Sequence, residues 1–391
     1  MRFSGWFLVA AQLLLVLPLA IGQQTDEAQR VHAAVLGVDA HNDTLQRVLL
    51  ENVDIGKRLN DGEIDLPRLR DGGIHVPFFA MAVPEYYRGA DAVRGTLDFL
   101  DAMQRVLDKY PDQIELATSA SDIQRIVGKK KIAAVLTVEG GHQIADDLAV
   151  LRMYRRMGVL SMTLTHFRSN DWADSATGKA DHNGLTEFGK EVVREMNRVG
   201  MIVDVSHVSD KTFYDVLAVS TKPVIASHSS CRVFSDVPRN MSDDMLRALA
   251  RNGGVVGVNF GASFLNQKEA DRLKSSIASR NALEPDLKGP ELEQFALKQR
   301  VTSAYDHPRV GQATLEDAAN CIDHIAKVAG IDHVGIGSDF DGIQDVSKGI
   351  EDISKLPALT SALLERNYSE QDIQKIMGVN FLRVIRSVVG E

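Results

Sequence analysis

Side chains that commonly bind metals stand at the ends of short apolar runs throughout this 391-residue chain. The residues at or just beyond the ends of these runs are His41, Asp43, Glu139, His166, His207, His228 and Asp339. Imidazole and carboxylate ligands together suit zinc, and a metal site with open positions can activate water for hydrolysis. The residue types therefore predict a hydrolytic metal centre, provided that the fold brings the ends of these runs together.

The spacing of these residues indicates how two metal ions could be held. His41 and Asp43 are two positions apart, so on a strand both side chains face the same side and can reach one ion. The two oxygens of Glu139 allow it to bridge two ions, and His207 and His228 would complete the second. This inventory is the one that a two-metal hydrolytic site requires.

Eight apolar, β-branched runs carry these residues, each followed by a polar turn and a stretch with helical spacing. The runs cover residues 34–40, 74–83, 132–138, 159–165, 201–206, 223–227, 254–259 and 333–338, and amphipathic helices are predicted at 185–198, 209–219 and 241–251. This alternation implies a parallel sheet, and eight nearly continuous apolar strands favour a closed (β/α)8 barrel, the TIM-like α/β fold. The carboxyl ends of all barrel strands meet at one mouth, which would gather the candidate ligands.

Two segments depart from the regular alternation. Residues 84–131 form a long second crossover, and residues 261–310 form a charged insertion without a predicted strand. An insertion after a strand lies on the C-terminal face of a barrel, where it would add loops and helices, either as a wall of the active site or as a peripheral helical excursion. Gly335 and Gly337 predict a close backbone approach in a strand. They are not a dinucleotide-binding fingerprint, because no glycine-rich turn into a helix follows them.

The N-terminal residues have the features of a secretory signal peptide. Arg2 precedes an apolar run over residues 6–20, and small residues follow at 20–22. We expect residues 1–22 to be cleaved, residues 23–391 to form a single domain, and the protein to be exported to a periplasm or secreted without a stable membrane anchor. An uncleaved anchor is less favoured, because the run is shorter than the roughly 20 residues that a spanning helix needs.

Composition limits the partners and the cross-links of the chain. A formal net charge of −9 at pH 7 argues against a nucleic-acid partner. Cys231 and Cys321 are the only cysteines, so the chain is not a disulfide scaffold. The two thiols could pair in an oxidising compartment, but their separation in sequence does not give their distance, so pairing stays open.

Seven short segments of the chain resemble motifs of the membrane (renal) dipeptidase family, a dizinc branch of the amidohydrolase superfamily. They are Val38-Asp-Ala-His-Asn-Asp43, Val138-Glu-Gly-Gly141, Leu164-Thr-His166, Val203-Asp-Val-Ser-His207, Ala226-Ser-His-Ser-Ser230, Pro238-Arg-Asn240 and Gly337-Ser-Asp-Phe-Asp-Gly342. The resemblance runs in the family's order from about residue 34 to the segment Asn380-Phe-Leu-Arg-Val384.

The resemblance implies a (β/α)8 metallo-dipeptidase with two Zn²⁺ per chain, in which a metal-bridging hydroxide cleaves the peptide bond of a dipeptide. It implies that His41 and Asp43 bind one zinc, that His207 and His228 bind the other, and that Glu139 bridges both. It also implies that His166 positions and polarises the substrate, that Arg239 pairs with the substrate carboxylate, and that Asp339 handles the proton. Activity on dipeptides that contain a D-residue and on β-lactams is a further implication.

Departures from the family leave some expectations open. The lipid anchor and the multi-cysteine pattern of the mammalian members are missing, which argues against membrane attachment and disulfide-linked dimerisation and fits an exported bacterial member. A homodimer remains open. One alternative is another metal-dependent amidohydrolase of the same fold, acting on a cyclic amide, an N-acyl amino acid or a lactone. A second is a non-catalytic exported binding protein that holds its ligand in the barrel mouth.

Overall fold

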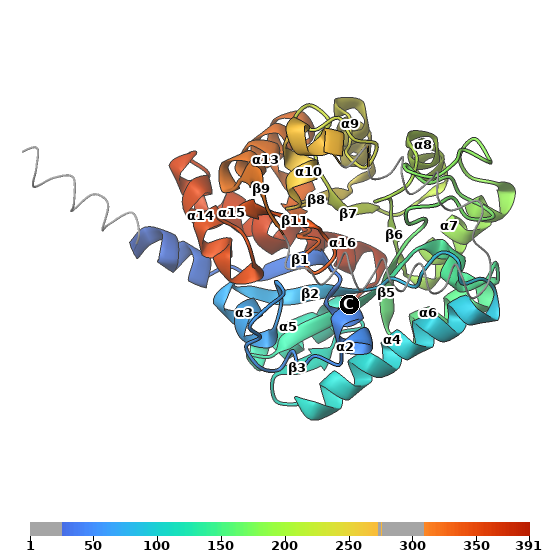
Figure 1. The fold of residues 1–391 in the computed structure, drawn as a ribbon, viewed down its shortest axis with the longest axis horizontal. Coiled ribbons are helices and arrows are strands. Elements are labelled where there is room, and N and C mark those ends of the chain that lie inside the picture. Colours follow the sequence, from blue (N-terminus) through green and yellow to red (C-terminus); the bar gives the residue numbers. More distant parts are fainter. Residues whose placement is uncertain (1–25, 273–274, 276–308) are drawn as a thin grey trace, which may run out of the picture.

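Eight parallel strands line the barrel of the computed structural model, which describes residues 26–272, 275 and 309–391. Helices lie around these strands (Figure 1). In hydrogen-bonded order the strands are β1 (Gly37–Asn42), β2 (Ile74–Met81), β4 (Ile132–Glu139), β5 (Val159–Thr163), β6 (Ile202–Asp204), β7 (Ile225–Ser229), β8 (Val255–Val258) and β10 (Val334–Ile336). Each observed strand overlaps one of the eight predicted runs.

The first and last strands close the barrel just beyond their regular pairing. The Asp339 N–H donates to the His41 carbonyl at 3.0 Å, and the Asp43 N–H donates to the Phe340 carbonyl at 2.9 Å. Asn42 and Phe340 pair as an isolated parallel bridge. The (β/α)8 barrel predicted from the sequence is therefore confirmed, and its closure brings Asp339 beside His41 and Asp43.

Helices connect the strands, and several begin at a residue whose side chain caps the first turn. The longer connecting helices are α4 (Ala90–Lys109), α5 (Ala120–Gly128), α6 (Leu148–Arg156), α7 (Glu187–Val199), α8 (Asp210–Val219), α9 (Asp243–Asn252), α13 (Leu315–Ala329) and α14 (Leu356–Glu365). The hydroxyls of Thr186, Ser209 and Ser242 each accept an N–H from the first turn of α7, α8 and α9. All three helices predicted from amphipathic spacing are confirmed within a few residues.

The C-terminal helix α16 (Asn380–Val388) closes the end of the barrel at which the strands begin. The Asn380 amide donates to the carbonyls of Ile331 and Val334, and Arg383 donates to the Gly253 carbonyl just before β8. Phe381 belongs to a buried apolar cluster that also includes residues of β1, β2 and β4. Because this end is filled with apolar side chains, the polar strand ends collect at the opposite mouth.

The structure adds short elements that the sequence did not predict. The crossover at 84–131 contains α4, a short strand β3 (Ile114–Leu116) beside β4, and α5. A separate two-stranded sheet joins β9 (Arg309–Thr314) to β11 (Asp345–Lys348), and a short helix α10 (Ala262–Leu265) follows β8.

The predicted signal peptide at 1–22 and most of the insertion at 261–310 lie outside the described residues. Within the described residues, no helix has both the length and the apolar character that crossing a bilayer requires.

A close approach to the backbone of β7 makes Gly337, which follows β10, sensitive to substitution, although β8 lies between these two strands in the sheet. A Cβ at Gly337 would overlap the Ser227 carbonyl oxygen, which confirms the close approach predicted from the sequence. We expect Gly337→Ala to lower the free energy of unfolding by about 1–3 kcal/mol, because backbone atoms must shift to admit the methyl group. Gly128→Ala is the matched control, since a Cβ there meets nothing within 4 Å. Thermal unfolding of both variants tests this, and equal melting temperatures would contradict it.

Candidate functional site: a metal centre at the barrel mouth

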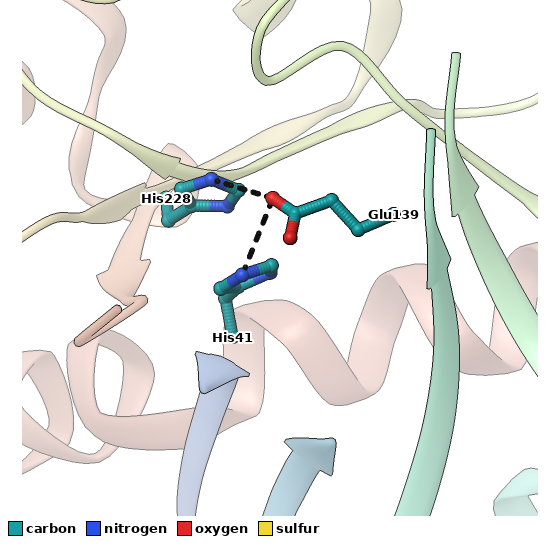
Figure 2. A group of neighbouring side chains, drawn as sticks. All are labelled: His41, Glu139 and His228. Carbon is teal, nitrogen blue, oxygen red and sulfur yellow. Dashed lines mark ion pairs between the residues drawn. The ribbon is translucent and has the colours of Figure 1, made fainter. Parts of the chain in front are cut away.

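Glu139 lies at the centre of the strand ends and contacts imidazoles from three other strands. It ends β4, in phase with the inward-facing residues of that strand, Ala133 and Val135. Its Oε1 atom lies 3.1 Å from Nε2 of His207, 3.4 Å from Nε2 of His228 and 3.5 Å from Nε2 of His41. Figure 2 shows this carboxylate between His41 at the end of β1 and His228 on β7. One carboxylate oxygen is thus shared among three ring nitrogens.

His207 and His228 face each other across the same point. Their Nε2 atoms are 2.9 Å apart, which orients both ring nitrogens toward Glu139. His207 follows β6 with a φ of 69°, in the left-handed region that a non-glycine residue adopts at a cost. Backbone strain of this kind persists where surrounding structure requires it, often at functional sites. Asp339 after β10 has a φ of 61° and shares the feature.

Asp43 and Asp339 each place one carboxylate oxygen near His41. Asp43 Oδ2 lies 3.5 Å and Asp339 Oδ1 lies 3.9 Å from Nε2 of His41. The second oxygen of Asp43 accepts a hydrogen bond from Gln46, and Asp339 Oδ2 accepts one from Asn259 at 2.7 Å. Each carboxylate therefore has one oxygen held by an amide and one near the centre.

The residues at this mouth fit a bound metal. Three overlapping groups, each with ligand atoms within 4.8 Å of one another, are His41–Glu139–His228, Glu139–His166–His207 and His41–Asp43–Asp339. Both ring nitrogens of His41 are buried and lack a hydrogen-bond partner among the residues that the structure describes. Buried polar atoms are normally hydrogen-bonded, and a metal ion at the centre would bind Nε2 of His41, which lies beside Glu139 and Asp43. Imidazole nitrogens mixed with carboxylate oxygens are a donor set for zinc and similar ions.

Burial and charge act on the titratable groups of this centre in opposite directions. Burial lowers the pKa of His41, but the nearby carboxylates, Glu139 first, outweigh it and raise that pKa to about 10. Burial raises the pKa of Asp339 to about 7, although the charge of His41 opposes the shift. The centre buries several carboxylates close together, and a bound cation would stabilise their charged forms.

Arg239 lies against this centre, and two of its nitrogen atoms have no hydrogen-bond acceptor among the described residues. Its side chain is buried, its Nη2 donates to the His228 carbonyl at 3.3 Å, and its guanidinium lies 5.5 Å from the ring centre of Phe264. Nε and Nη1 have no hydrogen-bond partner among the described residues. Burial lowers the pKa of Arg239 to about 10, so the group stays charged at neutral pH. A buried cation with free donors is costly unless an anion satisfies it.

The structure also shows residues that the sequence analysis missed. No site residue was predicted at the runs 74–83 and 254–259, but Glu85 lies just beyond the first run and Asn259 ends the second. Glu85 Oε1 lies 2.8 Å from Nδ1 of His166, whose Nε2 lies 3.9 Å from Glu139 Oε2. Both residues meet the criterion used for the metal ligands, which is a polar side chain at the end of a strand. Asn259 is the last residue of its run, and Glu85 lies two positions beyond the end of its run.

A buried relay beneath His228 was missed as well. The Ser227 hydroxyl lies 2.8 Å from Nδ1 of His228 and 2.5 Å from Asp204 Oδ2. Asp204 also accepts the N–H groups of Ser206 and Ser227. Such outer partners orient a metal-binding imidazole and set its tautomer. Asp204 and Ser227 each belong to a motif that resembles the dipeptidase family, and this membership is the sequence feature that could have identified them.

Comparisons with known proteins agree with this geometry. The model of the membrane dipeptidase family (peptidase family M19) matches residues 25–390. The chain is 34% identical over 400 residues to dipeptidase tcpJ of Claviceps purpurea, covering 97% of this chain and 84% of that protein. It is 39% identical over 375 residues to an uncharacterized dipeptidase, C965.12, of Schizosaccharomyces pombe, covering 90% and 80%.

Solved structures give the same assignment. The crystal structure of dipeptidase AC, described as a metallopeptidase, superposes with a TM-score of 0.76 at 25% identity, covering 91% of this chain and 99% of that one. The dipeptidase relatives and the candidate metal ligands favour hydrolysis over the binding-protein alternative. The chain therefore belongs to the membrane dipeptidase family, peptidase family M19, and is a metal-dependent hydrolase of dipeptides.

Proposed function

We propose that this hydrolase works with two zinc ions at the barrel mouth. His41 and Asp43 would hold one ion, His207 and His228 the other, and Glu139 would bridge them. The position of Glu139 Oε1, 3.1 to 3.5 Å from three imidazole nitrogens, carries this proposal. Zinc in such a site lowers the pKa of bound water toward about 7 and polarises a carbonyl, which is the chemistry that amide hydrolysis needs.

Arg239 would select the substrate by its free carboxylate. Its unpartnered Nε and Nη1 donors lie within a buried guanidinium that also packs beside Phe264. A guanidinium binds a carboxylate through two parallel hydrogen bonds, which adds geometric specificity to charge. A dipeptide bound in this way would present its only peptide bond at the centre.

The remaining steps fall to Asp339 and His166. Asp339 would accept the proton of the attacking water and deliver it to the leaving nitrogen, because one of its oxygens is near the centre while Asn259 holds the other. His166 would orient the scissile carbonyl and stabilise the charge that develops on its oxygen, since Nε2 points toward Glu139 while Nδ1 contacts Glu85.

Export is the second part of the proposal. It rests on the signal-peptide features of residues 1–22, which lie outside the described residues. A dipeptidase outside the cytosol would act on dipeptides before their uptake. The β-lactam ring resembles a dipeptide amide, so hydrolysis of some β-lactams is proposed as a side activity.

A substrate panel with chelation tests the metal and the carboxylate together. Initial rates would be measured on L-Ala-L-Ala, L-Ala-D-Ala and C-terminally amidated L-Ala-L-Ala, before and after chelation and zinc return. We expect zinc-restored cleavage of the free dipeptides alone. Equal cleavage of the amidated dipeptide would instead support the broader amidohydrolase alternative, and activity that survives complete chelation would contradict the metal centre.

Substitution of Arg239 tests the carboxylate contact by itself. We expect Arg239→Lys to raise KM for a free dipeptide by roughly 10–100-fold, because a point charge cannot reproduce the two parallel hydrogen bonds. Arg247→Lys is the matched control, since Arg247 on α9 is 49% exposed and pairs with Asp243 and Asp244. An unchanged KM in the Arg239 variant, measured by steady-state kinetics, would remove Arg239 from substrate recognition.

A further inference from the structure

The two cysteines of the chain meet beside the active-site loop. Cys231 Sγ lies 2.8 Å from Cys321 Sγ, although the residues are 90 positions apart in sequence. Both side chains are buried, at 1% and 0% exposed. The distance is longer than the about 2.05 Å of a disulfide, but so short that a small side-chain movement would form the bond.

The two thiols belong to different parts of the barrel. Cys231 stands two residues after β7, at the base of the loop that carries Arg239, and Cys321 lies on the buried face of α13. Hydrogen bonds close the base of this loop, from the Met241 N–H to the Ser230 carbonyl and from the Arg232 N–H to the Met241 carbonyl. A bond between the thiols would therefore tie this loop to a helix of the outer layer.

Nothing in the hydrolytic reaction uses these sulfurs. Neither cysteine belongs to the groups of metal-type ligands within the part of the chain that the structure describes. Burial also raises the pKa of the Cys231 thiol well above its ordinary value, so it is not a reactive thiolate. Two buried thiols in contact are suited to a structural cross-link rather than to chemistry on a substrate.

We propose that Cys231 and Cys321 form a disulfide in the mature protein. The step breaks two S–H bonds and forms one S–S bond, and a disulfide oxidant such as oxidised glutathione accepts the two electrons and two protons and becomes two thiols. The bond forms during folding, before burial closes off the sulfurs. It then holds the base of the Arg239 loop against α13 and shortens the free chain of the unfolded state.

Alkylation of the full chain tests the bond directly. The protein would be folded in a buffer of oxidised and reduced glutathione, denatured without reductant, alkylated with iodoacetamide and digested for mass spectrometry. We expect both cysteines to escape alkylation and to be recovered as one linked peptide pair that separates on reduction. Alkylation of both cysteines without prior reduction would overturn the proposal.

Thermal unfolding tests what the bond does. We expect a reductant to lower the melting temperature of the wild-type protein by about 5–10 °C. Cys231→Ala and Cys321→Ala, one at a time, would melt at the same temperature with and without reductant. An unchanged wild-type melting temperature after verified reduction would overturn the stabilising role. Neither measurement depends on activity, so the result is independent of the proposed function.

A different contact supports a second inference, which rests on the proposed role of His166. Glu85 Oε1 accepts the Phe167 N–H at 3.0 Å and also lies 2.8 Å from Nδ1 of His166. Both side chains are mostly buried, at 19% and 14% exposed. With Nδ1 engaged by this carboxylate, the ring can present only Nε2 to the centre.

We infer that Glu85 is a positioning residue for His166. Glu85→Ala would leave the ring free to rotate, and a catalytic group displaced by about 1 Å can cost roughly 10²-fold. We expect kcat to fall by about 10–100-fold, with KM, metal content and melting temperature unchanged. Glu85→Gln should restore most of kcat, because its amide oxygen can accept the same two N–H groups.

A double-mutant cycle separates positioning from a general effect. In a His166→Ala background, Glu85→Ala should cause no further loss of kcat. An equal loss in both backgrounds, or an unchanged kcat in Glu85→Ala alone, would overturn this inference. Full activity of His166→Ala would instead refute the proposed role of His166, so the two failures are distinguishable.

Discussion

Replacing Asp339 by asparagine is expected to lower kcat by about 10²–10⁴-fold while the bound metal is retained. Asparagine preserves the shape of the side chain and can still accept a hydrogen bond from Asn259, but it cannot take up a proton and pass it on. Asp339 Oδ2 accepts the Asn259 amide at 2.7 Å, and Oδ1 lies 3.9 Å from Nε2 of His41. Steady-state kinetics on a free dipeptide and the metal content of the same sample are the measurements.

Asp244→Asn provides the matched control for this prediction. Asp244 lies in the first turn of α9 with its side chain 84% exposed, and it pairs with Arg247. Its kcat should equal that of the wild type. Full turnover in Asp339→Asn would remove Asp339 from proton transfer, and a loss of metal together with activity would place Asp339 among the ligands instead.

Replacing Glu139 by glutamine should weaken metal binding at the centre by at least about 10²-fold and remove nearly all activity. Loss of an outer partner already costs 10–100-fold, and Glu139 would contact both ions directly. Glutamine keeps one oxygen but loses the negative charge and the second metal-binding oxygen. Competition with a chelator of known affinity gives the change in metal affinity without relying on turnover.

Thermal unfolding gives a second measurement on the Glu139 variant. A metal that binds only the folded state raises the melting temperature, so zinc should stabilise the wild type and have little effect on Glu139→Gln. Glu187→Gln is the control, because this glutamate at the start of α7 is 81% exposed and pairs with Lys190. Equal zinc stabilisation of Glu139→Gln and the wild type would show that Glu139 is not a ligand.

The barrel could be predicted from the sequence because its signal is local and repeated. A buried parallel strand is a short apolar run, and a covering helix repeats its apolar residues every three or four positions. Eight successive pairs of strand and helix can therefore be recognised from the sequence alone. The same regularity predicted where the polar residues would meet, since all strands of such a barrel end at one mouth. His41, Glu139, His207 and His228 are brought together there.

Short elements and pairings were not predictable in this way. β3 has three residues, from Ile114 to Leu116, which is too few to show a period. The sheet of β9 and β11 pairs Asp345 with Arg309, residues whose types carry no strand signal. Their backbone hydrogen bonds exist only because the surrounding barrel places the two segments side by side.

The order of strands and helices and the chemical types at the strand ends could be predicted from the sequence alone. Three contacts between side chains became known only from the closed barrel: Glu85 with His166, Asn259 with Asp339, and Cys231 with Cys321. Hydrophobic periodicity reports which face of an element is buried, because burial depends on the apolar area removed from water. A contact between two polar side chains depends instead on distances of a few ångströms across the closed barrel, and separation along the chain does not encode those distances.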